Sequence, residues 1–272
     1  MNDNPERNVP EEIGKLANLE TLILHGNKQI SGTIPKRWFN CASLWDLAMN
    51  ANDLTGTIPS EIGELRNLEY LYLQYNSLTG TIPSTLFNMT ALRIIVLRSN
   101  RFSGRLPSEF GHGLPNLEEI YLWNNQFSGQ FPSSISNCSK LTIVELSTNS
   151  FGPIPNSLGN LMHLERLNIE DNLFTGESSV PELSFLSSLT SCKALTRLVL
   201  AGNPLNRTLP TSIGEEYFAD KKDGVSFILG LSVECCVEVP DERNGITQVL
   251  STLVTIRTQF LATLAKTNEI GR

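Results

Sequence analysis

The sequence predicts an α/β solenoid, in which coils of the chain stack on one another and pair their strands into a parallel sheet. Two observations indicate this fold. One short sequence motif recurs along most of the chain, and within each copy the apolar residues alternate as they do in a strand. Each alternating run closes on an asparagine, and successive asparagines are 25, 24, 24, 25, 24, 23 and 31 residues apart. These asparagines are Asn27, Asn52, Asn76, Asn100, Asn125, Asn149, Asn172 and Asn203. Because each coil contacts only its neighbours, we expect the function on an extended face and not in a pocket.

The strand of each coil is clearest in the third copy. Leu71 and Leu73 are two residues apart, so both side chains lie on one side of a strand. Tyr70, Tyr72 and Gln74 then lie on the other side. One coil cannot bury its apolar side alone, so the leucines are expected in an interior that stacked coils share. Each fully buried leucine stabilises such a fold by about 1.5–3 kcal/mol.

The recurring asparagine stands where the strand ends and the chain turns away. A buried carboxamide has to satisfy both its donors and its acceptor. Backbone groups of the turn, in the same coil and in the adjacent coils, are its natural partners. The eight asparagines are therefore predicted to form a structural ladder along the solenoid.

The other half of the repeat carries a glycine followed by a proline. Five copies have this pair: Gly32 and Pro35, Gly56 and Pro59, Gly80 and Pro83, Gly104 and Pro107, Gly129 and Pro132. The full phrase, Leu-x-x-Leu-x-x-Leu-x-Leu-x-x-Asn-x-Leu-x-Gly-x-Ile-Pro, resembles the extracellular leucine-rich repeats of plant receptor-like serine/threonine kinases, from about Ile13 to Gly214. The resemblance implies a right-handed superhelix with a parallel sheet on its concave face, and it implies that this face binds peptides or protein fragments.

The seventh copy is longer than the others because it contains an insertion from Glu177 to Ser191. This insertion resembles those of the subgroup that includes the flagellin and elongation-factor receptors of plants. That narrower resemblance implies a receptor for defence, whereas the wider family also serves growth and development.

The repeat stops after Gly214, and the apolar residues then recur at helical spacing. The segment from about Tyr217 to Leu264 resembles the last two helices of the same family's kinase domain, in which the arginine matching Arg243 pairs with the glutamate of an Ala-Pro-Glu motif. That motif is absent from the kinase-like segment. We therefore expect a disordered segment over 1–12, a solenoid of about eight repeats over 13–214 and a helical tail over 215–272.

The sequence contains none of the motifs that phosphoryl transfer requires: a glycine-rich cover for the phosphates, a lysine that holds them, a catalytic aspartate and ligands for magnesium. We predict no catalytic residue, no metal site and no cofactor, and we expect that the chain as given is not an enzyme. The net charge of -7, without a basic stripe, argues against a nucleic-acid partner.

No leader peptide is found at the start of the sequence. Nor does the sequence contain an apolar run of the roughly 18–25 residues that a membrane-spanning helix needs. The family resemblance implies a plasma-membrane protein with extracellular repeats, so the location of this chain stays open.

Three cysteines occupy a position that leucine fills in other copies: Cys41, Cys138 and Cys192. Adjacent coils of a parallel sheet lie about 4.8 Å apart, which separates Cys41 from Cys138 by roughly 19 Å. A disulfide needs Cα atoms within about 7 Å. The three are predicted to be buried free thiols.

Three Asn-x-Ser/Thr sequences make Asn88, Asn137 and Asn206 candidate N-glycosylation sites. Each is expected to lie away from the strand, where a glycan could project. Matches of this length are also common by chance in a sequence rich in asparagine, so both interpretations remain open.

The outward positions of three neighbouring strands give the candidate ligand-binding residues. They are Tyr70, Tyr72, Tyr75, Arg98, Glu119, Tyr121 and Trp123. Aromatic residues with an arginine are typical of binding hot spots. The alternative is that tyrosines simply suit exposed sheet positions.

Three classes of function follow. The first is a module that recognises a peptide or protein ligand, derived from a plant cell-surface receptor kinase, with a co-receptor kinase as a candidate partner. The second is a fragment of a membrane-bound serine/threonine receptor kinase whose full gene encodes kinase activity. The third is a secreted protein like the plant polygalacturonase inhibitors, which share the repeat.

Overall fold

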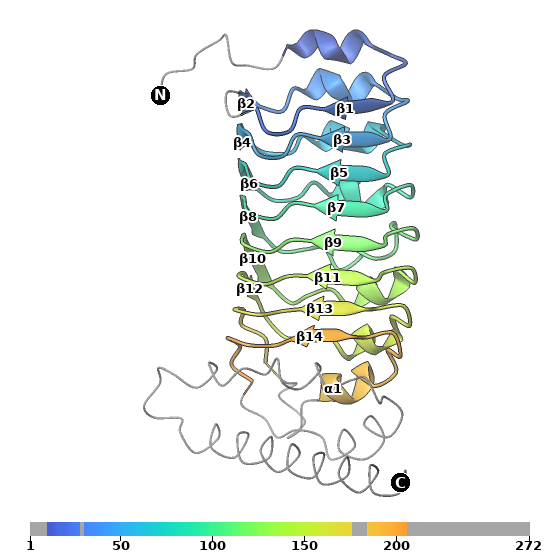
Figure 1. Ribbon diagram of the computed structural model, residues 1–272, viewed down its shortest axis with the longest axis vertical. Helices are drawn as coiled ribbons and strands as arrows, with labels where there is room; N and C mark the ends of the chain where they lie inside the picture. The colour runs from blue at the N-terminus through green and yellow to red at the C-terminus, as the bar shows by residue number, and fades with distance from the viewer. Residues whose placement is uncertain (1–9, 28–29, 176–183, 206–272) are drawn as a thin grey trace, which may run out of the picture.

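The structure, a computed structural model, describes residues 10–27, 30–175 and 184–205. These residues form a rod of stacked coils, and each coil contributes one strand to a parallel eight-stranded sheet that runs the length of the rod (Figure 1). The strand order is the order of the coils: β1 (Thr21–Ile23), β3 (Asp46–Ala48), β5 (Tyr70–Tyr72), β7 (Ile94–Val96), β9 (Glu119–Tyr121), β11 (Ile143–Glu145), β13 (Arg166–Asn168) and β14 (Arg197–Val199). The predicted solenoid and its parallel sheet are confirmed.

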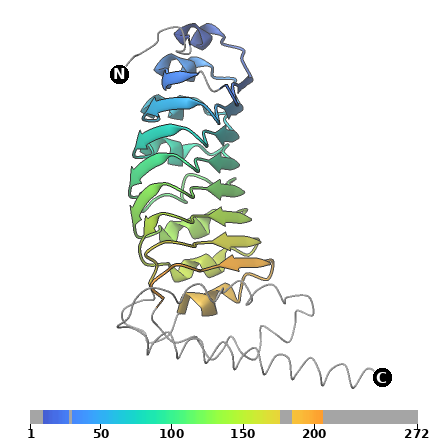
Figure 2. The same cartoon turned by 60° about the vertical axis from the view of Figure 1, so that its left-hand side comes forward.

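A second parallel sheet, which the sequence did not predict, runs beside the first (Figure 2). It consists of β2 (Ser31–Thr33), β4 (Asp53–Gly56), β6 (Ser77–Gly80), β8 (Arg101–Gly104), β10 (Gln126–Gly129) and β12 (Ser150–Phe151). Most of its strands end on a glycine of the Gly and Pro half of the repeat. At Gly104, φ is +82° and an added Cβ would lie 2.8 Å from the Thr81 methyl carbon. Only glycine therefore allows both this backbone conformation and the close approach of the preceding coil.

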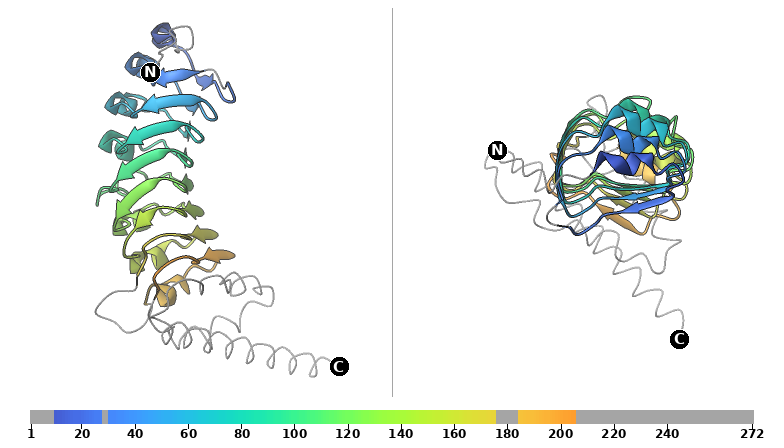
Figure 3. Two further views of the ribbon diagram at one scale, coloured as in Figure 1. Left: turned by 90° about the vertical axis from the view of Figure 1, so that its left-hand side faces the viewer. Right: turned by 90° about the horizontal axis from the view of Figure 1, so that it is seen from above.

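A short 3-10 helix completes most coils, on a side of the rod away from the strands (Figure 3). All six of these helices follow a proline in extended conformation, and a proline, which has no N–H to donate, suits the start of a helix. The helices are η2 (Glu11–Lys15), η3 (Lys36–Asn40), η4 (Ser60–Glu64), η5 (Ser84–Asn88), η6 (Ser133–Asn137) and η7 (Asn156–Asn160). Glu11 and Glu12, which the sequence placed in a disordered segment, belong to η2.

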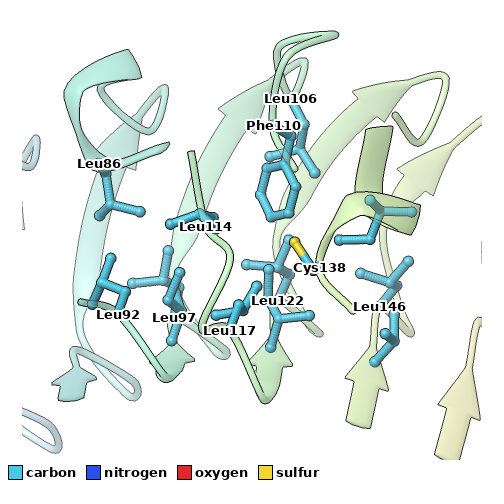
Figure 4. Packing of buried hydrophobic residues seen from close by; sticks show 14 of the residues in the cluster. Leu86, Leu92, Leu97, Leu106, Phe110, Leu114, Leu117, Leu122, Cys138 and Leu146 are labelled. Atoms are coloured by element: carbon cyan, nitrogen blue, oxygen red, sulfur yellow. The ribbon is translucent and has the colours of Figure 1, made fainter. Parts of the chain in front are cut away.

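One continuous apolar core fills the rod, and each coil adds its leucines to it (Figure 4). Leu71 and Leu73 are fully buried, as the alternation predicted. In the fourth to seventh coils a phenylalanine takes the leucine position that follows the asparagine. The rings of Phe102, Phe127 and Phe151 stack at centroid distances of 6.2 and 5.9 Å, which ties the coils together along the axis.

The asparagine ladder is confirmed and has the same geometry in six coils. The Asn76 amide donates to the carbonyl oxygens of Leu73 (3.0 Å) and, in the preceding coil, Met49 (2.9 Å). Its Oδ1 accepts the N–H of Leu54 at 3.0 Å. The same three bonds recur at Asn100, Asn125, Asn149, Asn172 and Asn203.

The ladder is incomplete at its N-terminal end. Asn27 donates to Leu24 and His25 of its own coil and is exposed. Asn52 donates normally, but its buried Oδ1 has no partner in the described part of the chain. By the register of the other coils this oxygen would accept from Ile30, whose N–H instead bonds to the Asn27 carbonyl at 2.8 Å. The first repeat has one extra residue, which shifts that register.

The three cysteines are buried and free, as predicted. Each thiol points at a carbonyl oxygen of the preceding coil: Cys41 at Ile13 (3.5 Å), Cys138 at Gly111 (3.8 Å) and Cys192 at Leu158 (3.5 Å). Burial raises the pKa of Cys138 to about 12, so this thiol stays protonated and unreactive in the folded protein.

The described end of the insertion is part of the stack. α1 (Ser184–Leu189) lies beside η7, where other coils have a 3-10 helix, and buries Phe185 and Leu189. The first part of the insertion, the helical tail predicted over 215–272 with Arg243, and the candidate glycosylation site Asn206 lie outside the described residues.

Candidate ligand-binding face

The outer face of the eight-stranded sheet presents its side chains in rows, because the strands pair without any shift in register. One row begins each strand: Thr21, Asp46, Tyr70, Ile94, Glu119, Ile143, Arg166 and Arg197. The next row ends each strand: Ile23, Ala48, Tyr72, Val96, Tyr121, Glu145, Asn168 and Val199. Backbone hydrogen bonds between coils continue past the strands, so the residues that follow are also held in rows.

The structure brings the seven predicted site residues together over three successive coils. They form what we call the aromatic patch: Tyr70, Tyr72, Tyr75, Arg98, Glu119, Tyr121 and Trp123. Four of them lie within β5 and β9, and the other three lie two or three residues beyond the ends of β5, β7 and β9. The patch is therefore built on strands at one side and on turns at the other.

Arg98 lies between two aromatic rings. Its guanidinium carbon is 5.0 Å from the ring centroid of Tyr75 and 5.1 Å from that of Trp123, within cation–π range. The backbone sets this arrangement: Tyr75 has a left-handed φ of 57°, and its N–H bonds to the Arg98 carbonyl at 3.1 Å. We call these three residues the Arg98 clamp.

The tyrosines of the strands are partly buried, and one of their hydroxyl groups is hydrogen-bonded to a carboxylate. The Tyr121 hydroxyl donates to Glu119 Oε2 at 2.8 Å. Burial, and next this hydrogen bond, raise the pKa of Tyr121. Burial and the nearby Asp46 and Glu119 carboxylates raise the pKa of Tyr72. Both phenols therefore remain neutral donors at physiological pH.

Not every outward position of the sheet is open, as Val96 shows. It belongs to the outer face, yet only 6% of its surface is exposed. Its neighbours in the row are Tyr72 and Tyr121, which are much larger and shield it from both sides. Ala48, on the other side of Tyr72, is buried in the same way. The tyrosines thus form a nearly continuous surface over these small residues.

The sequence-based list missed a charged cluster beside the patch. Arg93 donates from Nε and Nη2 to the two oxygens of Glu118 at 3.0 and 3.1 Å, and from Nη1 to the Tyr70 hydroxyl at 2.9 Å. Glu69 is 3.5 Å from Nη1, and Trp45 contacts the Tyr70 ring edge-on at 5.8 Å. These residues stand one position before their strands, with opposite charges in adjacent coils, so extending the rows by one residue would have found them. The cluster fixes the orientation of Tyr70.

Two carboxylates near the patch are unusual because they are partly desolvated. Burial raises the pKa of Asp46, whose Oδ1 has no hydrogen-bond partner in the described coils. Burial also raises the pKa of Glu145, and Asn168 and three arginines, Arg98 among them, oppose that rise. Carboxylates of this kind gain from a partner that supplies a hydrogen-bond donor.

Two candidate glycosylation sites are placed by the structure. Asn88 and Asn137 are exposed at the last positions of η5 and η6, on the helical side of the rod (Figure 3). A glycan at either position would leave the outer sheet face uncovered.

The described part of the chain, residues 10–27, 30–175 and 184–205, has no group of three or more His, Cys, Asp or Glu side chains arranged to hold a metal ion. None of its helices is both long and apolar enough to cross a membrane.

Comparison with protein families identifies the repeats. A model described as "Leucine rich repeat" matches residues 115–174, and a second model of the same description matches residues 67–89 and 91–112. A search of curated proteins by sequence found no match. The fold is thus a leucine-rich-repeat solenoid.

Among solved structures, the chain is similar to ectodomains of plant receptors. The plant peptide hormone receptor RGFR1 in complex with RGF2 matches with a TM-score of 0.68 and 32% identity, over 73% of this chain and 31% of that one. PEPR1 with AtPEP1 matches at 0.69 and 34%, over 76% and 28%. The Arabidopsis receptor kinase HAESA, in complex with the peptide hormone IDA and the co-receptor SERK1, matches at 0.52 and 26%, over 73% and 44%. The chain thus spans less than half the length of each of these relatives.

Proposed function

We propose that this leucine-rich-repeat solenoid is a ligand-recognition module of a plant receptor kinase, and that the aromatic patch binds a peptide. The observation that carries the proposal is the patch itself, because it gathers five aromatic residues and an arginine from three coils onto one open face. Residues of these types dominate the binding energy of protein interfaces. The similar solved structures are receptors described in complex with peptide hormones, which supports the same class of ligand.

The dimensions of the patch suit an extended peptide. Neighbouring strands lie about 4.8 Å apart, and an extended chain rises about 3.3 Å per residue, so about three peptide residues would cross the three coils. The tyrosine hydroxyls and the carboxylates of Asp46 and Glu119 offer hydrogen-bonding groups along that path. Partial burial of the rings before binding reduces the side-chain entropy that a ligand would have to overcome.

The narrower parts of the proposal concern the whole receptor. The insertion after the seventh asparagine supports the subgroup of flagellin and elongation-factor receptors, and the exposed Asn88 and Asn137 are in keeping with an extracellular location at the plasma membrane. A co-receptor kinase is the second proposed partner, by analogy with HAESA and SERK1. The kinase-like tail supports the view that the gene encodes a receptor kinase.

The test measures peptide binding to the wild-type chain and to a variant in which the Trp123 side chain is truncated to alanine. Peptides are selected from a random display library on the wild-type protein, and their Kd is then measured on the variant Trp123→Ala. If the indole is an anchor, Trp123→Ala weakens binding by about 2 kcal/mol, roughly thirtyfold in Kd. Met162→Ala is the control, because Met162 is an exposed apolar side chain in the turn after η7, outside the patch. An unchanged Kd for Trp123→Ala removes the patch from the proposal, and a library that yields no binding peptide removes the function.

A further inference from the structure

Two arginines of the same coil have opposite environments. Arg93 makes two hydrogen bonds to Glu118 and one to the Tyr70 hydroxyl. Arg98 has neither an ion pair nor a side-chain hydrogen bond within the described coils, and its Nε is buried without a partner. Within these coils the five N–H donors of Arg98 thus have no protein acceptor, and the buried Nε–H is the costly one because it has also lost contact with water.

Arg98 is nevertheless held in place. The Tyr75 and Trp123 rings lie 5.0 and 5.1 Å from the guanidinium carbon. Contacts with two rings restrict the rotation of a long side chain, and they leave the edge of the planar group, where its N–H donors lie, as the part that can accept a ligand. A fixed donor edge loses little entropy when an acceptor binds to it.

We propose that Arg98 is a carboxylate-binding site, which recognises an acidic side chain or the free carboxyl terminus of a peptide ligand. The inference rests on the proposed function, and it specifies the chemistry that the ligand must carry. A carboxylate is planar and matches the donor edge of a guanidinium through two parallel hydrogen bonds. The ligand carboxylate would bind the two Nη groups of Arg98, because its Nε is buried, whereas Glu118 binds Nε and Nη2 of Arg93.

The charges around Arg98 favour a carboxylate over a more highly charged anion. Glu145 is close enough to Arg98 for the two charges to interact, although it forms no ion pair with it. Glu119 lies in the neighbouring coil, and the whole chain has a net charge of -7. A phosphate or sulfate ester would bring more negative charge, or a non-planar group, to a site with one free cation and two carboxylates near it.

The test compares peptides that differ only in one charge. Short random peptides are selected on the full chain from two synthetic libraries, one with free carboxyl termini and one with amidated termini. Enrichment of Asp and Glu in the amidated library identifies a side chain as the source of the carboxylate, and enrichment restricted to free termini identifies the chain end. Each selected peptide is then paired with its neutral counterpart, Glu replaced by Gln or the terminus amidated.

On the wild-type protein we expect the charged peptide to bind on the order of tenfold to a hundredfold more tightly than its neutral counterpart. On Arg98→Gln this preference is expected to disappear, and on Arg98→Lys to shrink, because an ammonium group keeps the charge but lacks the planar donor edge. Arg101→Gln is the control, since Arg101 belongs to the same coil and carries the same charge but lies on the second sheet. The comparison is between two peptides on one protein, so a change in stability of the variant does not imitate the result.

Two outcomes would overturn the inference. If the selected peptides show no preference for a carboxylate, or if Arg98→Gln keeps that preference, Arg98 is not the site, although peptide binding by the patch remains. If no peptide from either library binds the wild-type chain, the inference fails together with the proposed function.

Discussion

The interior of the coils and the outer face of the eight-stranded sheet follow opposite rules. Inside, the recurring asparagine makes the same three hydrogen bonds in six successive coils, from Asn76 to Asn203. Outside, the row that ends each strand changes residue type at every step from Ile23 to Val199. A stack of identical coils needs identical contacts between neighbours, whereas a ligand is distinguished only where the coils differ.

The Arg98 clamp shows how the two regions are joined. The left-handed backbone at Tyr75 recurs at the same position in other coils, at Ala51, Ser99 and Asn124 among others. The turn is thus part of the repeated interior scaffold, but the side chain that it projects is not repeated. The scaffold fixes where a side chain points, and the individual residue decides what it binds.

The largest expected effect comes from breaking the interior. Asn76→Ala would leave the Leu54 N–H without a partner and would remove one of the two side-chain hydrogen bonds that the carbonyl groups of Met49 and Leu73 each accept. Because an unsatisfied buried donor costs about 1–3 kcal/mol and each lost hydrogen bond about 0.5–1.5 kcal/mol, we expect a loss of roughly 3 kcal/mol in the free energy of unfolding. Denaturant unfolding of the full chain, followed by circular dichroism, measures it. Gln74→Ala, two residues earlier on the outer face, should change that free energy by less than about 1 kcal/mol. Equal losses for the two variants would contradict the comparison.

A smaller interior effect is expected where neighbouring coils approach closely. Gly104→Ala places a methyl group 2.8 Å from the Thr81 methyl carbon and forces alanine into a φ of +82°, which should destabilise the protein by about 1–3 kcal/mol. Gly26→Ala has a similar φ of +73° but no atom within 4 Å of the new Cβ. The difference between their thermal unfolding midpoints isolates the contact between coils from the backbone strain. If the two midpoints fall equally, close approach is not what selects glycine in the second sheet.

The smallest expected effect is a loss of stability at high pH, which tests whether the Cys138 thiol is buried. The pKa of the Cys138 thiol is raised from 9.0 in the unfolded chain to about 12 in the fold. Below pH 9 the thiol is protonated in both the folded and the unfolded state, so the stability that its burial provides is fully present there. That stability is lost as the pH rises from 9 towards the pKa of the folded state. At pH 10, one unit above the unfolded value, the wild-type protein should have lost about 1.4 kcal/mol more stability than Cys138→Ala, relative to pH 8. Parallel pH profiles for the two proteins would indicate that Cys138 is accessible to water.

Repetition explains why so much of the interior could be predicted. Any one copy of the phrase is weak evidence, but eight copies at nearly constant spacing leave few alternatives, and the strand, the ladder and the buried cysteines all follow from the same alignment. The second sheet escaped prediction because its strands have at most one clearly apolar position each, as Leu54 and Leu78 show, and most of them end in glycine. Its pairing is created by the stacking of coils and not by a local pattern.

The outer face was only partly predictable. The rows of Tyr70, Tyr72, Glu119 and Tyr121 follow from strand alternation and the repeat period. The Arg93 cluster was missed because its residues precede the strands, and the burial of Val96 was missed because shielding depends on the size of side chains in adjacent coils.

The sequence by itself determined the period, the inward and outward sides of each strand and the asparagines that close it, because these depend on spacing along one chain. Only the tertiary structure decided which side chains of neighbouring coils meet: that Arg93 is paired with Glu118, while Arg98 lies between Tyr75 and Trp123 with no hydrogen-bond acceptor among the described residues. The physical reason is that such contacts join residues about 25 positions apart in sequence, across coils that lie about 4.8 Å apart only once the solenoid has stacked.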